Sequence, residues 1–144
     1  MGWGPPRAQS LPMELFTDFT ESSTNRILHF ALELTVWGTL GAWGWRHGGW
    51  TGWLLAAALP LLIIVSWNAF AVPHDPWLPG GRDGDQPWVD VPGWVRLAYE
   101  AAVHGLAAWL LVRMGHPQWA VVFATGFLVH YAVSYQRVLW LFRV

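Results

Sequence analysis

The sequence contains no cysteine and no lysine, and charged residues make up only 12% of its 144 positions. Without cysteine the chain has no disulfide, no thiolate metal ligand and no cysteine nucleophile. The eight basic residues are all arginine, they form no basic stripe, and the formal net charge is −1. A protein that neutralises a run of phosphates needs such a stripe, so we expect no nucleic-acid partner.

Apolar residues, by contrast, make up 54% of the sequence, and with so little charge this composition is unlike that of a soluble domain. They gather in four blocks, at residues 26–45, 51–72, 94–114 and 118–140. Each block is close to the ~20 residues that an α-helix needs to cross the ~30 Å hydrocarbon layer of a bilayer. We therefore predict an all-α integral membrane protein in which residues 26–144 form a bundle of four transmembrane helices.

The connections between the blocks differ in length. Residues 46–50 separate the first two blocks and residues 115–117 the last two, so both pairs are predicted to be tight antiparallel hairpins. The central loop, residues 73–93, holds five prolines, four glycines and four aspartates and cannot be helical throughout. It is either an ordered lid over the mouth of the bundle or a plain linker.

The N-terminal segment, residues 1–25, is predicted to lie on the cytoplasmic surface of the membrane. Ser10 can cap a short helix in which leucine and phenylalanine side chains fall on one stripe while the acidic side chains face away. This pattern is typical of an interfacial amphipathic helix.

The arginines are distributed unevenly along the chain. Six lie in or beside the termini and the central loop, and two lie on the side of the short hairpin turns. By the positive-inside rule we expect both termini and the central loop in the cytoplasm of a bacterium, with the chain crossing the inner (plasma) membrane several times. The six arginines are Arg7, Arg26, Arg82, Arg96, Arg137 and Arg143.

Two carboxyl groups fall inside predicted spans, Glu33 in the first and Glu100 in the third. An ionised carboxylate at the centre of a membrane helix costs roughly 2.5 to 3.5 kcal/mol on insertion scales. The presence of two such groups therefore indicates that they have a role. At ~1.5 Å per residue both lie ~9 to 12 Å from the cytoplasmic boundary. Each has a histidine one turn away, His29 and His104 respectively. These four side chains are our candidate catalytic residues.

All four predicted spans bring polar or aromatic side chains to this depth. Because lipid cannot satisfy polar groups, we expect these faces to point inward and to line a polar, aromatic-walled cavity that opens toward the cytoplasm. The alternative is a hydrogen-bonded core that only holds the helices together. The candidate substrate-binding residues are Trp37, Trp67, Asn68, Phe70, Phe30, His130, Tyr131 and Tyr135.

Burial disfavours the charged form of a carboxyl group and two nearby carboxylates repel, so at least one of the two glutamates is expected to be protonated at neutral pH. Arg96 lies one turn from Glu100 and favours its ionised form, which leaves Glu33 as the proton donor. A protonated carboxyl group among aromatic rings can protonate an epoxide or alkene of a prenyl chain and stabilise the resulting cation. We expect acid-catalysed cyclisation of such a lipophilic small molecule without a metal or cofactor, because no predicted helix carries an Asp-rich motif for a diphosphate.

The segment Trp67-Asn68-Ala69-Phe70-Ala71-Val72-Pro73, together with Glu33 and Glu100, resembles the YrdB-like family of small bacterial four-helix membrane proteins. The resemblance covers most of the chain, and it chiefly implies the fold. In kind, the chain is also similar to the small integral membrane terpene cyclases of bacterial meroterpenoid pathways. That likeness implies that paired acids carry the protonation.

Two other functions are compatible with the sequence. A membrane glutamate in the first of four helices is similar to the small multidrug resistance transporters, which suggests a proton-coupled exporter of lipophilic compounds acting as a homo-oligomer. The 21-residue central loop and the second acid in the third span depart from that pattern. The other alternative is a non-catalytic membrane assembly subunit.

Overall fold

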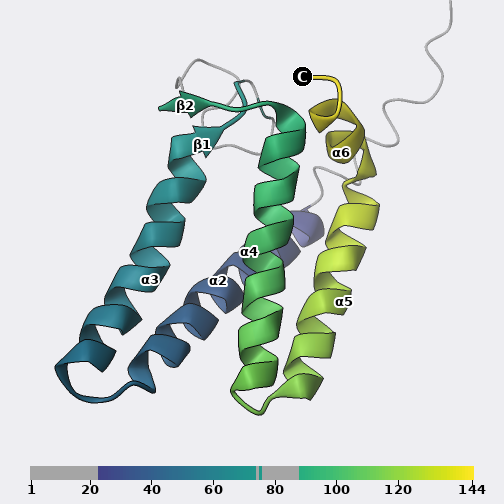
Figure 1. Cartoon of the computed structure of the whole chain (residues 1–144). Coiled ribbons are helices and arrows are strands. Elements are labelled where there is room, and N and C mark those ends of the chain that lie inside the picture. Colours follow the sequence, from purple (N-terminus) through teal and green to yellow (C-terminus); the bar gives the residue numbers. More distant parts are fainter. Residues whose placement is uncertain (1–22, 74, 76–87) are drawn as a thin grey trace, which may run out of the picture.

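The computed structural model describes residues 23–73, 75 and 88–144. Residues 1–22, where the amphipathic helix is predicted, lie outside these ranges. The mostly helical fold is confirmed (Figure 1). The helices are α2 (Ser23–Trp45), α3 (Gly49–Ala69), α4 (Gly93–Arg113), α5 (Pro117–Val133) and α6 (Tyr135–Leu141).

The fourth predicted span, residues 118–140, consists of two helices, α5 and α6, and not of one continuous helix. Between α5 and α6 the backbone of Ser134 leaves the regular helical conformation, with φ −91° and ψ 22°. Ser134 is buried, and its Oγ accepts a hydrogen bond from Asn25 Nδ2 at 2.9 Å. The break lets α6 pack against α4 as well as α5.

The second predicted span also ends earlier than expected, because Phe70–Ala71 leave α3 and form the short strand β1. This strand pairs in parallel with β2 (Val89–Asp90), with Phe70 opposite Val89. The sheet therefore joins the two ends of the central loop. Residues 76–87, on which the choice between lid and linker depends, lie outside the described residues.

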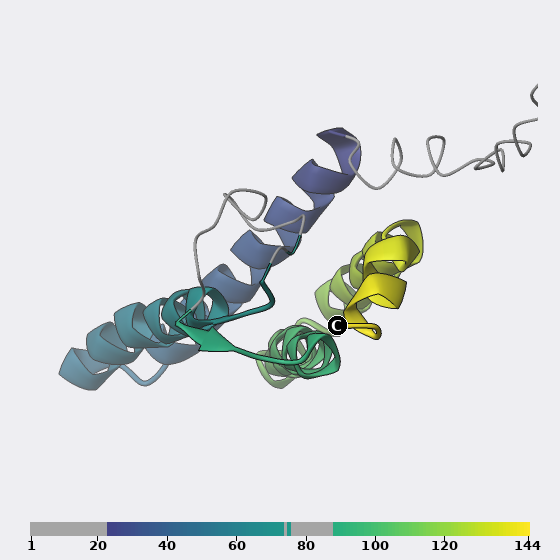
Figure 2. The ribbon, with the colours of Figure 1, turned by 90° about the horizontal axis from the view of Figure 1, so that it is seen from above.

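The long helices form two hairpins with short turns at residues 46–48 and 114–116. Helix α2 packs along α3, and α4 packs along α5. Seen from above, α2 runs obliquely past the other helices, and it contacts both α4 and α5 (Figure 2). The C-terminus lies at the same end as the sheet (Figure 1), where the Gly93 N–H donates to the Val144 carbonyl at 3.0 Å.

Small residues let α2 and α3 approach each other closely. A Cβ atom added to Gly44 would lie 2.6 Å from backbone atoms of Leu55 and Ala56. A Cβ atom added to Gly52 would lie 3.0 Å from the carbonyl oxygen of Trp45. Backbone contact through small residues is typical of helix pairs in membranes.

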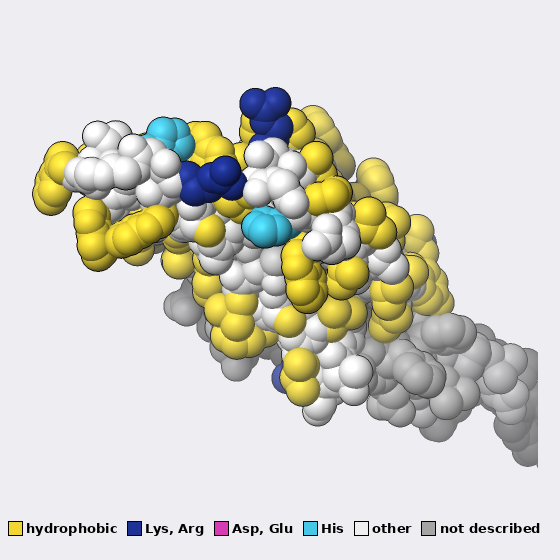
Figure 3. All heavy atoms as spheres, turned by 90° about the horizontal axis from the view of Figure 1, so that it is seen from below, with side chains coloured by type: hydrophobic (Ala, Val, Ile, Leu, Met, Phe, Trp, Pro, Cys, Tyr) yellow, Lys and Arg dark blue, Asp and Glu magenta, His cyan; other side chains and the backbone are white. Residues whose placement is uncertain are grey.

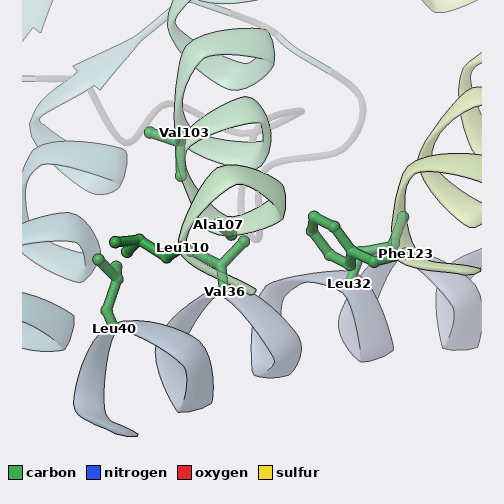
Figure 4. Packing of buried hydrophobic residues seen from close by; sticks show 7 residues of the cluster. All are labelled: Leu32, Val36, Leu40, Val103, Ala107, Leu110 and Phe123. Atoms are coloured by element: carbon green, nitrogen blue, oxygen red, sulfur yellow. The ribbon is translucent and has the colours of Figure 1, made fainter. Parts of the chain in front are cut away.

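The apolar core lies where α2 crosses the second hairpin. In Figure 4, Leu32 of α2 lies beside Phe123 of α5, and Val36 faces Ala107 of α4. The oblique course of α2 thus places one stripe of its side chains against both helices. The buried cluster consists of Leu32, Val36, Leu40, Val103, Ala107, Leu110 and Phe123.

The outside of the bundle is also apolar. Helices α3 and α4 are long and apolar enough to span a membrane, with mean hydropathies of 1.8 and 1.3. Only 6% of the α3 segment and 33% of the α4 segment are buried, whereas an equally apolar core helix of a soluble protein would be mostly buried. Helix α5 likewise exposes Val121, Val122, Leu128 and Val129. An exposed apolar surface of this extent marks a site of contact with a membrane or with another protein.

Two glycines of α2 provide a matched test of the contact with α3. Gly44→Ala places a methyl group against the α3 backbone, so we expect it to lower the free energy of unfolding by about 1–3 kcal/mol. Gly38→Ala meets no atom within 4 Å and should be neutral or stabilise the fold by up to about 1 kcal/mol. Unfolding in detergent, followed by circular dichroism, compares the two variants. Equal effects would contradict the close approach of the two helices.

Candidate functional site

Glu100 is fully enclosed in the bundle, with 1% of its surface exposed. Its carboxylate accepts a hydrogen bond from Arg96 Nε at 2.8 Å and two from Arg137, from Nη1 at 3.0 Å and Nη2 at 2.8 Å. The Tyr131 hydroxyl donates to the same carboxylate. Four donors from α4, α5 and α6 therefore surround one acid.

Arg137 also binds a second buried acid, Asp75, which lies just beyond β1. Its Nε and Nη2 atoms donate to the two carboxylate oxygens of Asp75 at 3.1 Å and 2.7 Å, the two-point geometry typical of guanidinium–carboxylate pairs. We call Asp75, Arg96, Glu100 and Arg137 the ion cluster. It fastens the start of the central loop to α4 and α6.

Arg96 connects the ion cluster to the C-terminal end of α3. Its Nη1 atom donates to the carbonyl oxygens of Trp67, at 2.6 Å, and Phe70. These carbonyls lie at a helix end, where backbone acceptors lack partners within the helix. The guanidinium also lies 4.4 Å from the centre of the Trp67 ring, within the range of a cation–π contact.

The ion cluster is balanced and saturated. Two arginines face two carboxylates, and no buried side-chain nitrogen or oxygen in the described part of the chain lacks a hydrogen-bond partner. An acid held by two cations stays ionised, because each opposite charge favours its charged form. Glu100 therefore has no proton to donate, and its geometry is that of a structural group.

Glu33 belongs to a different set of side chains, which joins α2 to α5. Its Oε1 atom lies 3.4 Å from His29 Nε2, and His29 Nδ1 lies 3.3 Å from His130 Nε2. His130 Nδ1 in turn lies 2.9 Å from Asn25 Oδ1, and Asn25 bonds to Ser134. We call Asn25, His29, Glu33, His130 and Ser134 the histidine relay.

Glu33 also lines a small cleft between α2, α3 and α4. The cleft has a volume of ≈ 10 Å³, enough for about one water molecule. One carboxyl group, two indole rings and one imidazole face it, with apolar side chains between them. The lining residues are Glu33, Val36, Trp37, Ile63, Trp67, Val103 and His104.

His104 is the second ionisable side chain of the cleft. Its Nδ1 atom lies 2.7 Å from the carbonyl oxygen of Glu100. A carbonyl oxygen only accepts, so Nδ1 carries the proton of this bond and Nε2 is the basic nitrogen of the neutral ring. One cleft thus holds an acid on α2 and a base on α4.

The structure distributes the predicted site residues over three places. The cleft unites Glu33, Trp37, Trp67 and His104. Glu100 and Tyr131 lie in and beside the ion cluster, and His29 and His130 belong to the histidine relay. Within the described ranges, no three His, Asp or Glu side chains gather closely enough to hold a metal ion.

Six predicted substrate-binding residues do not line the cleft, namely His130 and Tyr131, placed above, and Asn68, Phe70, Phe30 and Tyr135. Asn68 is exposed and donates to the Ile64 carbonyl of its own helix at 2.7 Å. The ring of Phe70 lies 6.3 Å from that of Tyr99, and its backbone binds Arg96. Phe30 and Tyr135 are exposed, with exposed fractions of 55% and 42%.

Sequence reasoning missed three residues that hold these clusters together: Asn25, Asp75 and Arg137. Arg137 was counted among the cytoplasmic arginines, although it is only 7% exposed. A signal was present, because His130, Ser134 and Arg137 follow one another at helical spacing and all three are buried. Asp75 carries no such signal, since it lies in a loop.

Polar clusters inside an apolar helical bundle define the class of this protein: a small helical protein with two helices long and apolar enough to span a membrane. The chain belongs to the YrdB-like family: the family model described as "Protein of unknown function (DUF2568)" matches residues 27–128. It is similar to the "Uncharacterized protein YrdB" of Bacillus subtilis (strain 168), with 32% identity over 121 residues that cover 83% of this chain and 94% of the relative. No solved structure matches the chain.

Removing one arginine tests the structural role of the ion cluster. Arg137→Met leaves two buried carboxylates without their shared cation, so we expect a loss of about 3–5 kcal/mol in the free energy of unfolding. Arg143→Met, at an exposed position, should change it by less than about 0.5 kcal/mol. Unfolding in detergent measures both variants, and similar stabilities would show that the cluster does not support the fold.

Proposed function

We propose that the chain is a multi-pass protein of the bacterial inner membrane that cyclises a prenyl substrate by acid catalysis at Glu33. The observation that carries the proposal is the cleft, in which a carboxyl group faces two indole rings and a basic imidazole. The membrane topology and the reaction are separate parts of the proposal. Each is supported by different observations and has its own test.

Helix length and surface support four spans. Helices α3 and α4 have 21 residues each, or ~32 Å, and α5 has 17 residues, or ~26 Å, against a hydrocarbon layer of ~30 Å. Helix α2 has 23 residues and takes an oblique course. The ends with the short turns carry arginine and histidine side chains among apolar ones, and no acidic side chain is visible on that face (Figure 3).

The absence of cysteine makes the topology testable with single-cysteine variants. With both termini in the cytoplasm, His47→Cys and His116→Cys at the short turns should react with an impermeant maleimide added to intact cells. Ser23→Cys and Arg143→Cys should react only after the membrane is permeabilised. Labelling of one turn but not the other would rule out four spans, and the reverse pattern would invert the orientation.

The reaction starts with a proton from Glu33. Transfer of this proton to the epoxide oxygen breaks a C–O bond and leaves a cationic carbon, which a nearby alkene attacks to close a ring. In this proposal the rings of Trp37 and Trp67, which line the cleft, stabilise the cation. His104 Nε2 then accepts the proton that the final carbocation releases, so the product has the mass of the substrate.

The size of the cleft sets a condition on this mechanism. A prenyl chain is far larger than ≈ 10 Å³, so substrate entry requires movement of the side chains between α3 and α4. Polar contacts between these helices lie at the C-terminal end of α3, where Ser66 Oγ bonds to the Tyr99 hydroxyl at 2.5 Å and Arg96 binds the Trp67 carbonyl.

Activity measurements test the role of Glu33. Purified protein given a terminally epoxidised prenyl compound should yield a cyclised isomer of unchanged mass. Glu33→Gln should reduce the rate at least ~10²-fold, the usual contribution of a general acid. Thr35→Ala is the control on the same helix, because its hydroxyl bonds only to the Ala31 carbonyl. Product formed equally fast by Glu33→Gln would exclude Glu33 as the acid.

The narrow cleft also favours a second candidate, a non-catalytic assembly subunit, since a saturated polar core needs no ligand. In that case wild-type protein forms no product, while Arg137→Met still unfolds easily.

A proton-coupled exporter would instead show substrate-driven proton flux in reconstituted vesicles. The same purified protein serves all three assays.

A further inference from the structure

Both short turns lie at the same end of the bundle (Figure 1), and this end carries basic side chains without acidic ones. One exposed arginine and one exposed histidine lie at each turn. We call these four residues the basic end: Arg46, His47, Arg113 and His116. Figure 3 shows this face with no acidic side chain in view. The sequence explains why, because no aspartate or glutamate lies between Glu33 and Asp75 or after Glu100.

The arginines of the basic end differ from those of the ion cluster in their partners. Within the described part of the chain, neither Arg46 nor Arg113 forms an ion pair. Arg46 Nη1 donates to the Met114 carbonyl at 3.0 Å, and the Arg113 guanidinium lies 5.6 Å from the centre of the Trp109 ring. The bond to Met114 places the Arg46 guanidinium beside the residue that follows Arg113. Two positive charges from different hairpins therefore share one surface.

Tryptophan side chains lie near the basic end, in the first or last two turns of the four long helices. Five of them are more than half exposed: Trp45, Trp50, Trp53, Trp109 and Trp119. The rings of Trp45 and Trp53 lie 4.3 Å apart and, with Gly48 and Gly49, line a hollow of ≈ 140 Å³. Exposed tryptophans are typical of the interface between lipid and water. In the proposed topology they place the basic end at the level of the lipid headgroups.

The charge of the basic end is complementary to an anionic phospholipid. A guanidinium binds the oxygens of a phosphate through two parallel hydrogen bonds. A zwitterionic headgroup carries an ammonium group of its own, which two arginines repel, whereas an anionic headgroup lacks this group. The two arginines also run against the distribution of the other six, which lie toward the opposite end. A bound anionic lipid supplies the counter-charge that the chain does not provide here.

We propose that the basic end binds the headgroup of an anionic phospholipid, with Arg46 and Arg113 on its phosphate and the hollow between Trp45 and Trp53 beside it. Because the two arginines belong to different hairpins, one headgroup joins α2 and α3 to α4 and α5. The inference rests on the membrane topology of the proposed function and is independent of the reaction.

Native mass spectrometry of the full-length protein in detergent measures which lipid it retains. From equal amounts of phosphatidylglycerol and phosphatidylcholine with the same acyl chains, we expect the protein to retain phosphatidylglycerol preferentially. Arg46→Gln/Arg113→Gln should lower this preference about fivefold for each arginine removed. Arg26→Gln/Arg143→Gln is the matched control, because it removes the same charge from exposed positions at the opposite end. The control should retain the preference.

Three results would overturn the inference. An unchanged preference in Arg46→Gln/Arg113→Gln would exclude the two arginines as the binding groups. An equal loss in both double variants would show a response to net charge alone. Displacement of the lipid by millimolar inorganic phosphate would identify a site for a free anion. Circular dichroism checks the fold, and Arg113→Gln alone, at an exposed position, provides the test if the double variant is unstable.

The outcome is separable from that of the proposed reaction. If the lipid preference depends on the turn arginines but no substrate is cyclised, the lipid site stands and the reaction falls. If product forms in a protein without this preference, the reaction stands and the lipid site falls.

Discussion

The contact between Glu100 and Arg137 is the interaction on which the bundle depends. This contact joins α4 to α6. A second edge of the Arg137 guanidinium binds Asp75, which lies just beyond β1. Arg96 completes the charge balance and binds the carbonyls at the end of α3. A charge with 1% exposure is tolerated only when it is paired and fully hydrogen-bonded, so Glu100 depends on its partners from α4, α5 and α6. The break at Ser134 ends α5 and starts α6, the helix that carries Arg137.

The same interaction distinguishes the surroundings of Glu100 from those of Glu33. Glu100 is surrounded by cations and hydroxyl donors, whereas the nearest ionisable partner of Glu33 is an imidazole whose other nitrogen is already engaged. The arginines beside Glu100 favour its ionised form. Two glutamates at similar depth therefore need not form a pair, and the bundle keeps them apart by placing them in different clusters. His104 lies between these sites, since its backbone-bonded Nδ1 faces Glu100 and its ring lines the cleft of Glu33.

Much of the fold could be predicted from the sequence, because helix positions follow from the length and boundaries of apolar blocks. The first three blocks match α2, α3 and α4 to within three residues at each end. The clusters were harder to predict, because they depend on side chains that meet across more than 60 residues of sequence, such as Asp75 and Arg137. Counting arginines by position also treats every one as exposed, whereas Arg96 and Arg137 are buried. One cavity lined by all four spans was predicted, whereas the cleft is lined by α2, α3 and α4, because periodicity shows which faces are polar and not how closely those faces approach.

The distribution of polarity in this bundle is the inverse of that in a soluble protein, and this inversion connects its stability with its chemistry. Apolar side chains such as Trp53 and Leu62 lie outside, while two complete ion pairs lie inside. A buried polar group is shielded from solvent, so it has to find its partner within the chain. The ion cluster meets that requirement, because each carboxylate oxygen of Glu100 and Asp75 accepts a hydrogen bond. The ion cluster is therefore part of the fold, whereas Glu33 lies outside it and is the group on which the proposed acid catalysis depends.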